Sequence, residues 1–349
     1  MNTLQLGNKN VGDGHPAFIV AEIGINHQGD VNIARDLIQK AKECGADAVK
    51  FQKRSLTRIL TKAGLDMAYD NRNSFGKTYG EHKKALELSE ADYHELNIFC
   101  QKLDIIFCAS GWDEESIGFL DELGIPFFKM ASADLTNFPL LIHTAKKNKP
   151  MILSTGMADM KMVQAAYSQV NPINNQIAIL QCTSTYPSAF SEVHLNVLQT
   201  YMKEFPDTVI GYSGHEQGIA IPPAAVALGS KIIERHFTLD RTMKGGDHAA
   251  SLEPQGFAKM VRDIRHIEKA MGNTEKKIQE SEAPVFRKLA KSIVSAVNIS
   301  SGDSITANML TTKGPGTGIS PMRLNELIGK ISKIDIPADQ VIMEEDIQW

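Results

Sequence analysis

The 349-residue chain has few of the features that mark extracellular, redox or membrane proteins. Its only cysteines are Cys44, Cys100, Cys108 and Cys182, and no C-x-x-C pair occurs, which favours reduced, buried thiols over a zinc or redox motif. No uninterrupted apolar run reaches 18 residues, and the N-terminus lacks the basic and apolar regions of a signal peptide. We therefore expect a cytoplasmic protein with no membrane partner.

The chain also lacks an excess of charge of one sign. Its formal net charge is -4 and its pI is near 6.2, so there is no general electrostatic reason to bind nucleic acid. With 42% hydrophobic and 22% charged residues, the composition is that of a globular protein with a sizeable core. An anionic ligand would need a local basic site.

From residue 17 onward, short apolar runs alternate with longer amphipathic stretches. This alternation is typical of βα units around a parallel sheet. The runs predict eight strands at 18–24, 46–52, 104–110, 126–132, 150–156, 177–183, 208–214 and 231–237. Eight βα units indicate a (β/α)8 TIM barrel, a fold whose active site lies at the carboxyl ends of its strands.

The spacing of these units also divides the chain into domains. We expect a barrel domain at 1–272, a charged linker at 273–291 and a small β-rich domain at 292–349 that leans on the barrel or on another subunit. Residues 53–88 separate two strands by an unusually long stretch rich in Lys, Tyr and Gly. Such a loop at the reactive face of a barrel is a candidate lid.

Polar side chains end nearly every predicted strand. Lys50 and Lys129 stand inside apolar strands, where an ammonium group is unfavourable unless it pairs with an anion; a buried ion pair within the core explains each lysine equally well on its own. Hydroxyl groups are weaker evidence because Ser and Thr also cap helices. Together these groups suit a small anion that carries a phosphate and a carboxylate. The other strand ends carry Glu22, Gln52, Ser110, Ser132, Ser154, Ser184, Ser213, Glu234 and Arg235.

Two histidines follow neighbouring strands, His215 in "GYSGH" and His236 in "IIERHF". An isolated histidine is more often a satisfied core residue than a ligand. Adjacent strand ends bring two of them within reach of one ion, and two His with oxygen partners suit Mn²⁺, Fe²⁺, Co²⁺ or Zn²⁺. Asp247 and His248 follow in a Gly-flanked loop, where solvated turn residues are an equally good interpretation.

Eight motifs occur in an order that resembles one enzyme family. They read "AEIGINHQGD", "GADAVKFQK", "FKMAS", "ILSTGM", "QCTSTYP", "GYSGH", "ERHFTLD" and "GGDHAASLEP". Over nearly its whole length the chain resembles the sialic acid synthase family, and its tail "KGPGTGISPMRLNELIGK" resembles that family's antifreeze-like (SAF, β-clip) domain. The resemblance implies a transferase that condenses phosphoenolpyruvate with N-acetylmannosamine and water to give N-acetylneuraminate and phosphate. It also implies a divalent metal, Mn²⁺ first with Mg²⁺ or Co²⁺ as alternatives, and a domain-swapped homodimer.

The resemblance also assigns roles to individual residues. It makes His215 and His236 the metal ligands. It places Glu22, Gln52, Tyr186 and Asp247 at the sugar. It assigns phosphoenolpyruvate to Lys50, Ser110, Lys129, Ser132, Ser154, Ser184 and Ser213.

Three positions depart from the family pattern. Asp134 stands where bacterial members often have a Glu that holds a water at the metal, and we expect the shorter acid to act through an additional water. Ser184 replaces an Asn of some relatives. Gly314 replaces an Arg that reaches the partner subunit's sugar site, which affects how the acceptor is recognised.

The acceptor sugar is open between two alternatives. The segment "GKTYGEHKK" (76–84) resembles the animal-type enzymes, which use N-acetylmannosamine 6-phosphate and make the 9-phosphate. Its lysines suit an added phosphate, although such a charge run is usually a solvated face. Because the sequence does not show where Lys77 or Lys83 points, the unphosphorylated sugar is slightly favoured here.

Two other classes compete with this hypothesis. Synthases of octulosonate or heptulosonate phosphates are also barrels that use phosphoenolpyruvate, but the C-terminal domain argues against them. A non-catalytic sugar-binding protein would be expected to have lost Lys129, His215 or His236, and all three are present.

Overall fold

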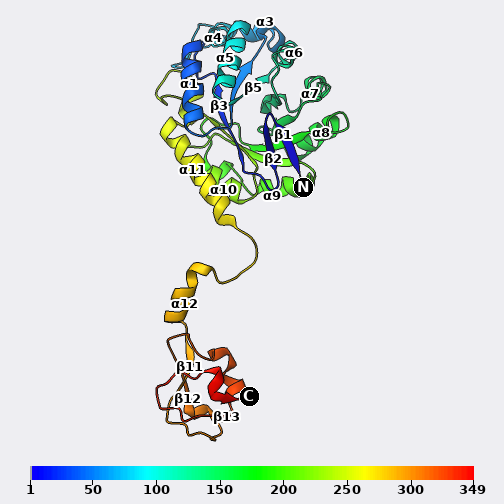
Figure 1. Ribbon diagram of the computed structural model, residues 1–349. Coiled ribbons are helices and arrows are strands. Elements are labelled where there is room, and N and C mark those ends of the chain that lie inside the picture. Colours follow the sequence, from blue (N-terminus) through cyan, green and yellow to red (C-terminus); the bar gives the residue numbers. More distant parts are fainter. Residues whose placement is uncertain (1) are drawn as a thin grey trace. The chain divides into compact units, whose positions relative to one another are not determined.

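Eight parallel strands form a closed barrel in the order β10-β3-β4-β5-β6-β7-β8-β9 (Figure 1). The computed structural model describes residues 2–349. The predicted (β/α)8 barrel is confirmed, and each predicted run overlaps one strand. The strands are β3 (Phe18–Gly24), β4 (Ala48–Lys53), β5 (Ile106–Gly111), β6 (Phe128–Met130), β7 (Met151–Ser154), β8 (Ile177–Cys182), β9 (Val209–Gly214) and β10 (Ile232–His236).

Helices surround the barrel and bury one face each against it. In α1 (Val31–Glu43), for example, Asp30 caps the first turn, and the buried residues Ala34, Leu37, Ile38 and Ala41 follow the spacing of one helical face. Within residues 2–349 no helix has both the length and the apolar character that crossing a membrane requires. The other large helices of the barrel are α5 (Glu90–Lys102), α6 (Glu114–Glu122), α7 (Phe138–Ala145), α8 (Met160–Val170), α9 (Val197–Glu204), α10 (Ile221–Ala227) and α11 (Pro254–Met271).

The interior of the barrel is layered. Residues that alternate along parallel strands point to the same side of the sheet, so side chains two positions apart fill successive layers. The lower layer is apolar and includes Val20, Ala48, Cys108, Phe127, Ile152, Leu180 and Ile232. Two residues further along these strands the layer is polar, and it contains Glu22, Lys50, Ser110, Lys129, Ser154, Cys182 and Glu234. The switch from apolar to polar therefore occurs at one level of the barrel.

A hairpin that the sequence analysis missed closes the other end of the barrel. Strands β1 (Thr3–Leu6) and β2 (Lys9–Gly12) pair antiparallel. Leu4, Leu6 and Val11 are buried in the same apolar cluster as the lower interior layer. Strands of four residues are too short for their alternation to be recognised in a sequence.

The segment 53–88 is more ordered than the expected loop. It contains three short helices, α2 (Leu56–Ile59), α3 (Lys62–Asp66) and α4 (Tyr79–Ala85). A capping box between Thr78 and Glu81 starts α4. The His82 ring then packs 4.5 Å from the Tyr69 ring. This packing gives α4 a defined orientation.

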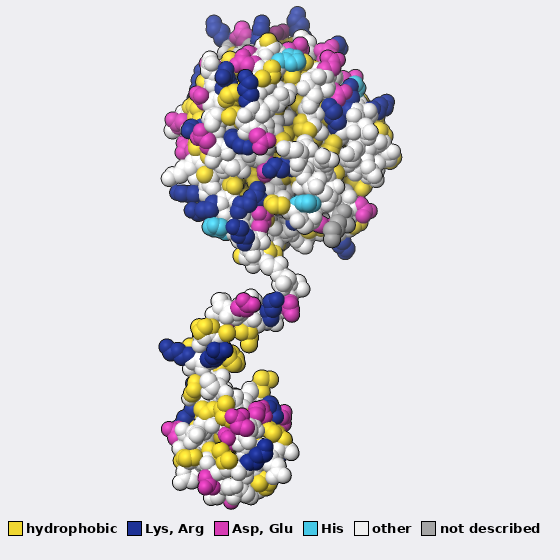
Figure 2. Space-filling view, viewed as in Figure 1, with side chains coloured by type: hydrophobic (Ala, Val, Ile, Leu, Met, Phe, Trp, Pro, Cys, Tyr) yellow, Lys and Arg dark blue, Asp and Glu magenta, His cyan; other side chains and the backbone are white. Residues whose placement is uncertain are grey.

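The contacts divide the chain into two compact units between Gly272 and Asn273. The second unit has its own apolar core, which includes Ile293, Ile305 and Ile342. A helix that the sequence analysis assigned to the linker, α12 (Ala283–Leu289), precedes this core, and Figure 2 shows apolar side chains gathered along it. The other elements are β11 (Ser292–Ser295), β12 (Leu310–Lys313), α13 (Leu324–Leu327), β13 (Ile331–Ser332) and β14 (Ile347–Gln348).

Candidate active site

A cavity of about 250 Å³ lies at the polar layer, where the strands end. Most of the sequence-predicted site residues meet there. Trp112, Met157, Cys182 and Glu234 also line it. The predicted residues in its wall are Glu22, Lys50, Gln52, Ser110, Lys129, Ser132, Ser154, Ser184, Tyr186, Ser213, His215 and His236.

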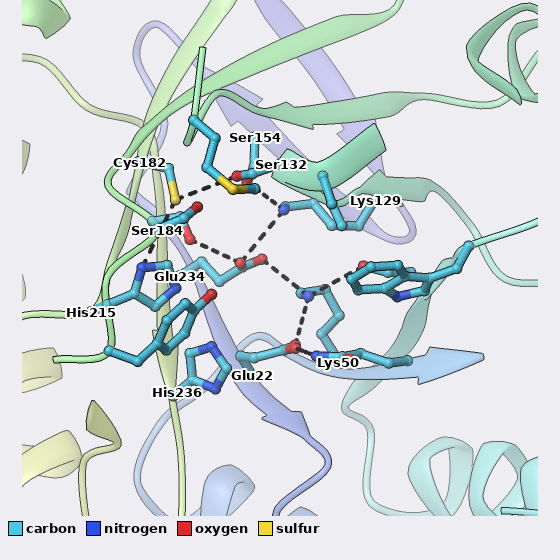
Figure 3. Close-up of a pocket in the computed structure, with 18 residues that line it drawn as sticks. Glu22, Lys50, Lys129, Ser132, Ser154, Cys182, Ser184, His215, Glu234 and His236 are labelled. Carbon is cyan, nitrogen blue, oxygen red and sulfur yellow. Dashed lines mark hydrogen bonds and ion pairs between the residues drawn. The ribbon is translucent and has the colours of Figure 1, made fainter. Parts of the chain in front are cut away.

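Glu22, Lys50, Lys129 and Glu234 form the floor of this cavity (Figure 3). The Lys50 ammonium lies 2.7 Å from the Glu22 carboxylate and 3.9 Å from that of Glu234. Glu234 also lies 3.6 Å from the Lys129 ammonium, which donates to Ser154 at 2.5 Å. All four residues are at least 94% buried, so their charges interact with little screening by water.

The floor carries two cations and two carboxylates, but the carboxylates differ. Burial opposes the charge on both. For Glu234 the ammonium groups of Lys129 and Lys50 outweigh burial and lower its pKa to about 2. For Glu22 burial outweighs the contact with Lys50 and raises its pKa to about 7. Near neutral pH Glu22 therefore exchanges a proton easily, and its protonated form leaves the floor with a net positive charge that suits an anion.

Hydroxyl groups complete the wall beside Lys129. Ser132 accepts a hydrogen bond from the Gly156 backbone N–H at 3.0 Å. A Cβ atom at Gly156 would lie 2.0 Å from the Ser184 Oγ and 2.8 Å from the Ser132 Oγ. Only glycine therefore lets the loop after β7 approach both hydroxyls.

The two histidines lie side by side next to the floor, with ring centroids 5.2 Å apart. The Nδ1 of His215 lies 2.7 Å from the Thr183 carbonyl oxygen. A carbonyl oxygen only accepts, so this Nδ1 carries a proton. Burial opposes a charge on the ring, but the contact with Cys182 outweighs burial and raises the pKa of His215. In the neutral form of the ring Nε2 keeps its lone pair. Burial lowers the pKa of His236 to about 3, which keeps its ring neutral at physiological pH. Tyr186 covers the pair, with its ring 4.1 Å from that of His215.

This pair has a property that metal-binding histidines need, because two adjacent rings can each offer a nitrogen lone pair in their neutral form. The Nδ1 of His236 is buried and has no hydrogen-bond partner, and the Asp247 carboxylate lies 3.7 Å from it. Among the described residues no three His, Cys, Asp or Glu side chains form a group that could hold an ion. The protein would thus supply two nitrogen ligands, leaving the remaining positions to substrate or water.

Asp134 and Asp247, which the sequence analysis also placed in the site, do not line the cavity. Asp134 is buried in the same short helix as Ser132 and accepts a hydrogen bond from Asn137 at 3.1 Å. Asp247 lies beside the cavity, next to His236.

Glu234 is the main residue of the floor to which the sequence analysis gave no role. It stands two positions before His236 in an apolar strand, so both side chains point into the barrel. That alternation was the signal that could have identified it.

Comparison with known protein families finds two matches along the chain. Residues 37–276 match the NeuB family and residues 290–348 match the SAF domain. The N-acetylneuraminate-9-phosphate synthase of Mus musculus is 48% identical over 97% of this chain and 94% of the mouse protein. The N,N'-diacetyllegionaminic acid synthase of Legionella pneumophila is 37% identical over 98% of both chains.

A solved crystal structure is also similar to this chain. The N-acetylneuraminic acid synthetase of Leptospira borgpetersenii, crystallised with citrate, superimposes with a TM-score of 0.70. It is 34% identical and covers 81% of this chain and 96% of its own.

Proposed function

Because this chain belongs to the NeuB family of phosphoenolpyruvate-dependent sialic acid and nonulosonate synthases, we propose that its acceptor is N-acetylmannosamine 6-phosphate. The proposed product is N-acetylneuraminate 9-phosphate. The observation that carries this choice is the 48% identity to the mouse 9-phosphate synthase over nearly the whole chain. Phosphoenolpyruvate adds three carbons ahead of carbon 1 of the sugar, so a phosphate on carbon 6 appears on carbon 9. This favours the second of the two acceptors that the sequence left open.

The floor supports the phosphoenolpyruvate half of the reaction. Lys50 and Lys129 supply positive charge, and Ser110, Ser132 and Ser154 supply hydroxyl groups around them. Oriented donors in a site with little water hold an anionic substrate and the charge that develops during reaction. The lysines also stand ready to hold the phosphate group that leaves.

The bonds change in two stages. Carbon 3 of phosphoenolpyruvate attacks the aldehyde carbon of the open-chain sugar, forming a C–C bond while the aldehyde oxygen takes a proton. Water then adds to carbon 2, and the C–O bond to phosphate breaks. We assign the proton exchange to Glu22, whose pKa of about 7 lets its carboxyl group donate or accept near neutral pH.

His215 and His236 are the residues that we propose to hold a divalent metal, Mn²⁺ first, with Mg²⁺ or Co²⁺ as alternatives. When bound, such an ion polarises a carbonyl oxygen as a Lewis acid. The observations in support are the two adjacent rings, with centroids 5.2 Å apart, and the burial that keeps the His236 ring neutral. Asp247 would orient the His236 ring from behind.

We further propose that the protein acts as a domain-swapped homodimer in the cytoplasm. Val285, Phe286 and Leu289 of α12 are 50% to 62% exposed, and a helix with such an apolar face needs a covering surface. All four cysteines are free thiols, as in reducing compartments. Phe286→Asp should then convert a dimer to a monomer in light scattering, whereas a monomeric wild-type protein would contradict the assembly.

The reaction itself has a direct test. Purified protein is incubated with phosphoenolpyruvate, Mn²⁺ and either N-acetylmannosamine 6-phosphate or N-acetylmannosamine. We expect phosphate release and the product mass of the nine-carbon sugar phosphate, with a higher kcat/KM for the phosphorylated acceptor. The absence of phosphate release with both acceptors would overturn the proposed reaction, and a preference for the free sugar would overturn the proposed acceptor.

A further inference from the structure

A second group of cations lies beyond the cavity, at the rim where β4 leaves the barrel. Arg54 follows β4 directly and is 96% buried. Lys83 comes from α4, 29 residues further along the chain, and is half-buried. Its ammonium lies 5.2 Å from the centre of the Tyr79 ring. The folding of the 53–88 segment thus brings α4 back to the end of β4.

These two cations have different partners. The Arg54 guanidinium binds the Glu87 carboxylate at 2.6 Å and reaches the Gln52 side-chain oxygen at 3.5 Å. Over residues 2–349, Lys83 has neither an ion pair within 4.0 Å nor a side-chain hydrogen bond. A half-buried ammonium without an anion is an unfavourable arrangement unless a ligand supplies the anion.

The pKa of Lys83 is consistent with an ammonium group that has no anion bound to it. Burial and the nearby charge of Arg54 lower the pKa of the Lys83 ammonium to about 8, against weaker opposing effects of Asp247 and Glu87. A carboxylate in contact with the ammonium would instead act to raise its pKa. The protein has therefore placed positive charge here without neutralising it.

The rim connects to the cavity through short contacts. Gln52 lines the cavity, donates to Glu22 at 3.0 Å and contacts Arg54. Gly24 has a φ of +54°, and a Cβ atom there would lie 3.0 Å from Glu22, 3.2 Å from Gln52 and 3.4 Å from Asp247. These side chains therefore converge over one glycine. Asp247 also lies beside His236 and is close enough to Lys83 to influence the pKa of its ammonium.

We propose that Lys83, with Arg54 beside it, binds the phosphate group of the acceptor sugar and selects the phosphorylated over the free sugar. This inference rests on the proposed function. A sugar whose aldehyde carbon lies at the histidines, above the floor, has its far end directed toward the rim. A dianionic phosphate there would supply the counter-charge that Lys83 lacks.

The test compares Lys83→Gln and Lys83→Arg with a matched control on the next residue, Lys84→Gln, whose side chain is exposed. Steady-state kcat/KM is measured for each variant with N-acetylmannosamine 6-phosphate and with N-acetylmannosamine. We expect Lys83→Gln to lower the ratio of the two values about 10- to 100-fold through KM of the phosphorylated sugar. Lys83→Arg should keep most of the ratio, and Lys84→Gln should leave it unchanged.

The possible outcomes separate the subsite from the reaction. An unchanged ratio in Lys83→Gln, or an equal loss with both acceptors, overturns the subsite while leaving the condensation intact. If wild-type protein releases no phosphate, the proposed reaction fails. Calorimetric binding of N-acetylmannosamine 6-phosphate then still tests Lys83, because equal affinity in wild type and Lys83→Gln contradicts the subsite.

Discussion

At the floor of the cavity, Lys50 and Lys129 are almost fully buried and lie against two carboxylates. At the rim, Lys83 is half-buried and pairs with none among the described residues. The floor charges are held in the register of neighbouring strands, as when Glu22 and Lys50 pair across β3 and β4. The rim charge is carried by a short helix in a long connection.

Because of this difference, the floor and the rim suit two different tasks in substrate binding. A compensated cluster on strands is stable without a ligand and presents a fixed geometry, which suits the reacting groups of phosphoenolpyruvate. An uncompensated cation on an inserted segment adds affinity only when an anion arrives. The rim can therefore change with the acceptor while the floor stays the same.

Loss of a histidine should have the largest effect. We expect His236→Ala to reduce turnover to background with both acceptors and to weaken Mn²⁺ binding, measured by electron paramagnetic resonance, at least about tenfold. A chelator should do the same to the wild-type protein. His266→Ala, an exposed position on α11, serves as control, and full activity of His236→Ala would contradict the two-ligand assignment.

A floor lysine should come next. Lys129→Met keeps the length of the side chain but removes its charge and leaves Glu234 with Lys50 alone, at 3.9 Å. We expect kcat/KM to fall about 10²- to 10³-fold equally for both acceptors, whereas Lys161→Met on the exposed face of α8 changes neither. A loss confined to one acceptor would break the division between floor and rim.

The pH dependence should distinguish the rim by a smaller effect. Above a pKa of about 8 Lys83 loses its charge, so KM for the phosphorylated sugar should rise by up to about tenfold per pH unit until the pKa of the complex is passed. The sugar phosphate stays dianionic in this range. Lys83→Arg should shift the rise to higher pH, and an identical profile in both proteins would contradict the role of Lys83. The charged or titratable groups around Lys83 include Arg54, Tyr79, His82, Glu87 and Asp247.

Thermal stability should show the smallest effect, at Glu22. With a pKa of about 7 against an ordinary 4.5, folded protein holds a proton between these pH values that the unfolded chain releases. The free energy of unfolding of the wild type, taken relative to that of Glu22→Gln at each pH, should therefore fall as pH rises from about 4.5 to 7, by at most about 1.4 kcal/mol per pH unit, and then level off. Taking the difference removes the opposite contribution of groups such as His236, whose lowered pKa makes stability rise with pH in part of this range. Glu95→Gln on the surface should show no such difference from wild type, and a difference for Glu22→Gln that does not change with pH would contradict the assignment to Glu22.

Most floor residues could be predicted from the sequence because side chains alternate between the two faces of a strand, with a period of two residues. A Lys inside an apolar strand stands out in the sequence. Eight strands in a closed barrel bring such polar residues to the same level of the barrel. The same alternation contained Glu234, although no role was drawn from it.

The role of the rim residues could not be predicted from the sequence in this way. In "EHKK" two adjacent lysines look equivalent, and only the packing of α4 makes Lys83 half-buried and Lys84 exposed. Asp134 shows the same limit, because the sequence does not reveal that its carboxylate accepts a hydrogen bond from Asn137 and lies outside the cavity wall. Tertiary contacts determine both outcomes, and no periodicity in the chain encodes them.

The N-terminal hairpin covers the end of the barrel that lies opposite the cavity. Leu4, Leu6 and Val11 pack in the same apolar cluster as the lower interior layer, so the cations and carboxylates of the floor have apolar side chains beneath them. Such a low-dielectric layer strengthens the interactions of these charges with one another and with an anion in the cavity. Two strands of four residues, at the end of the protein where no chemistry occurs, therefore contribute to the electrostatics of the site.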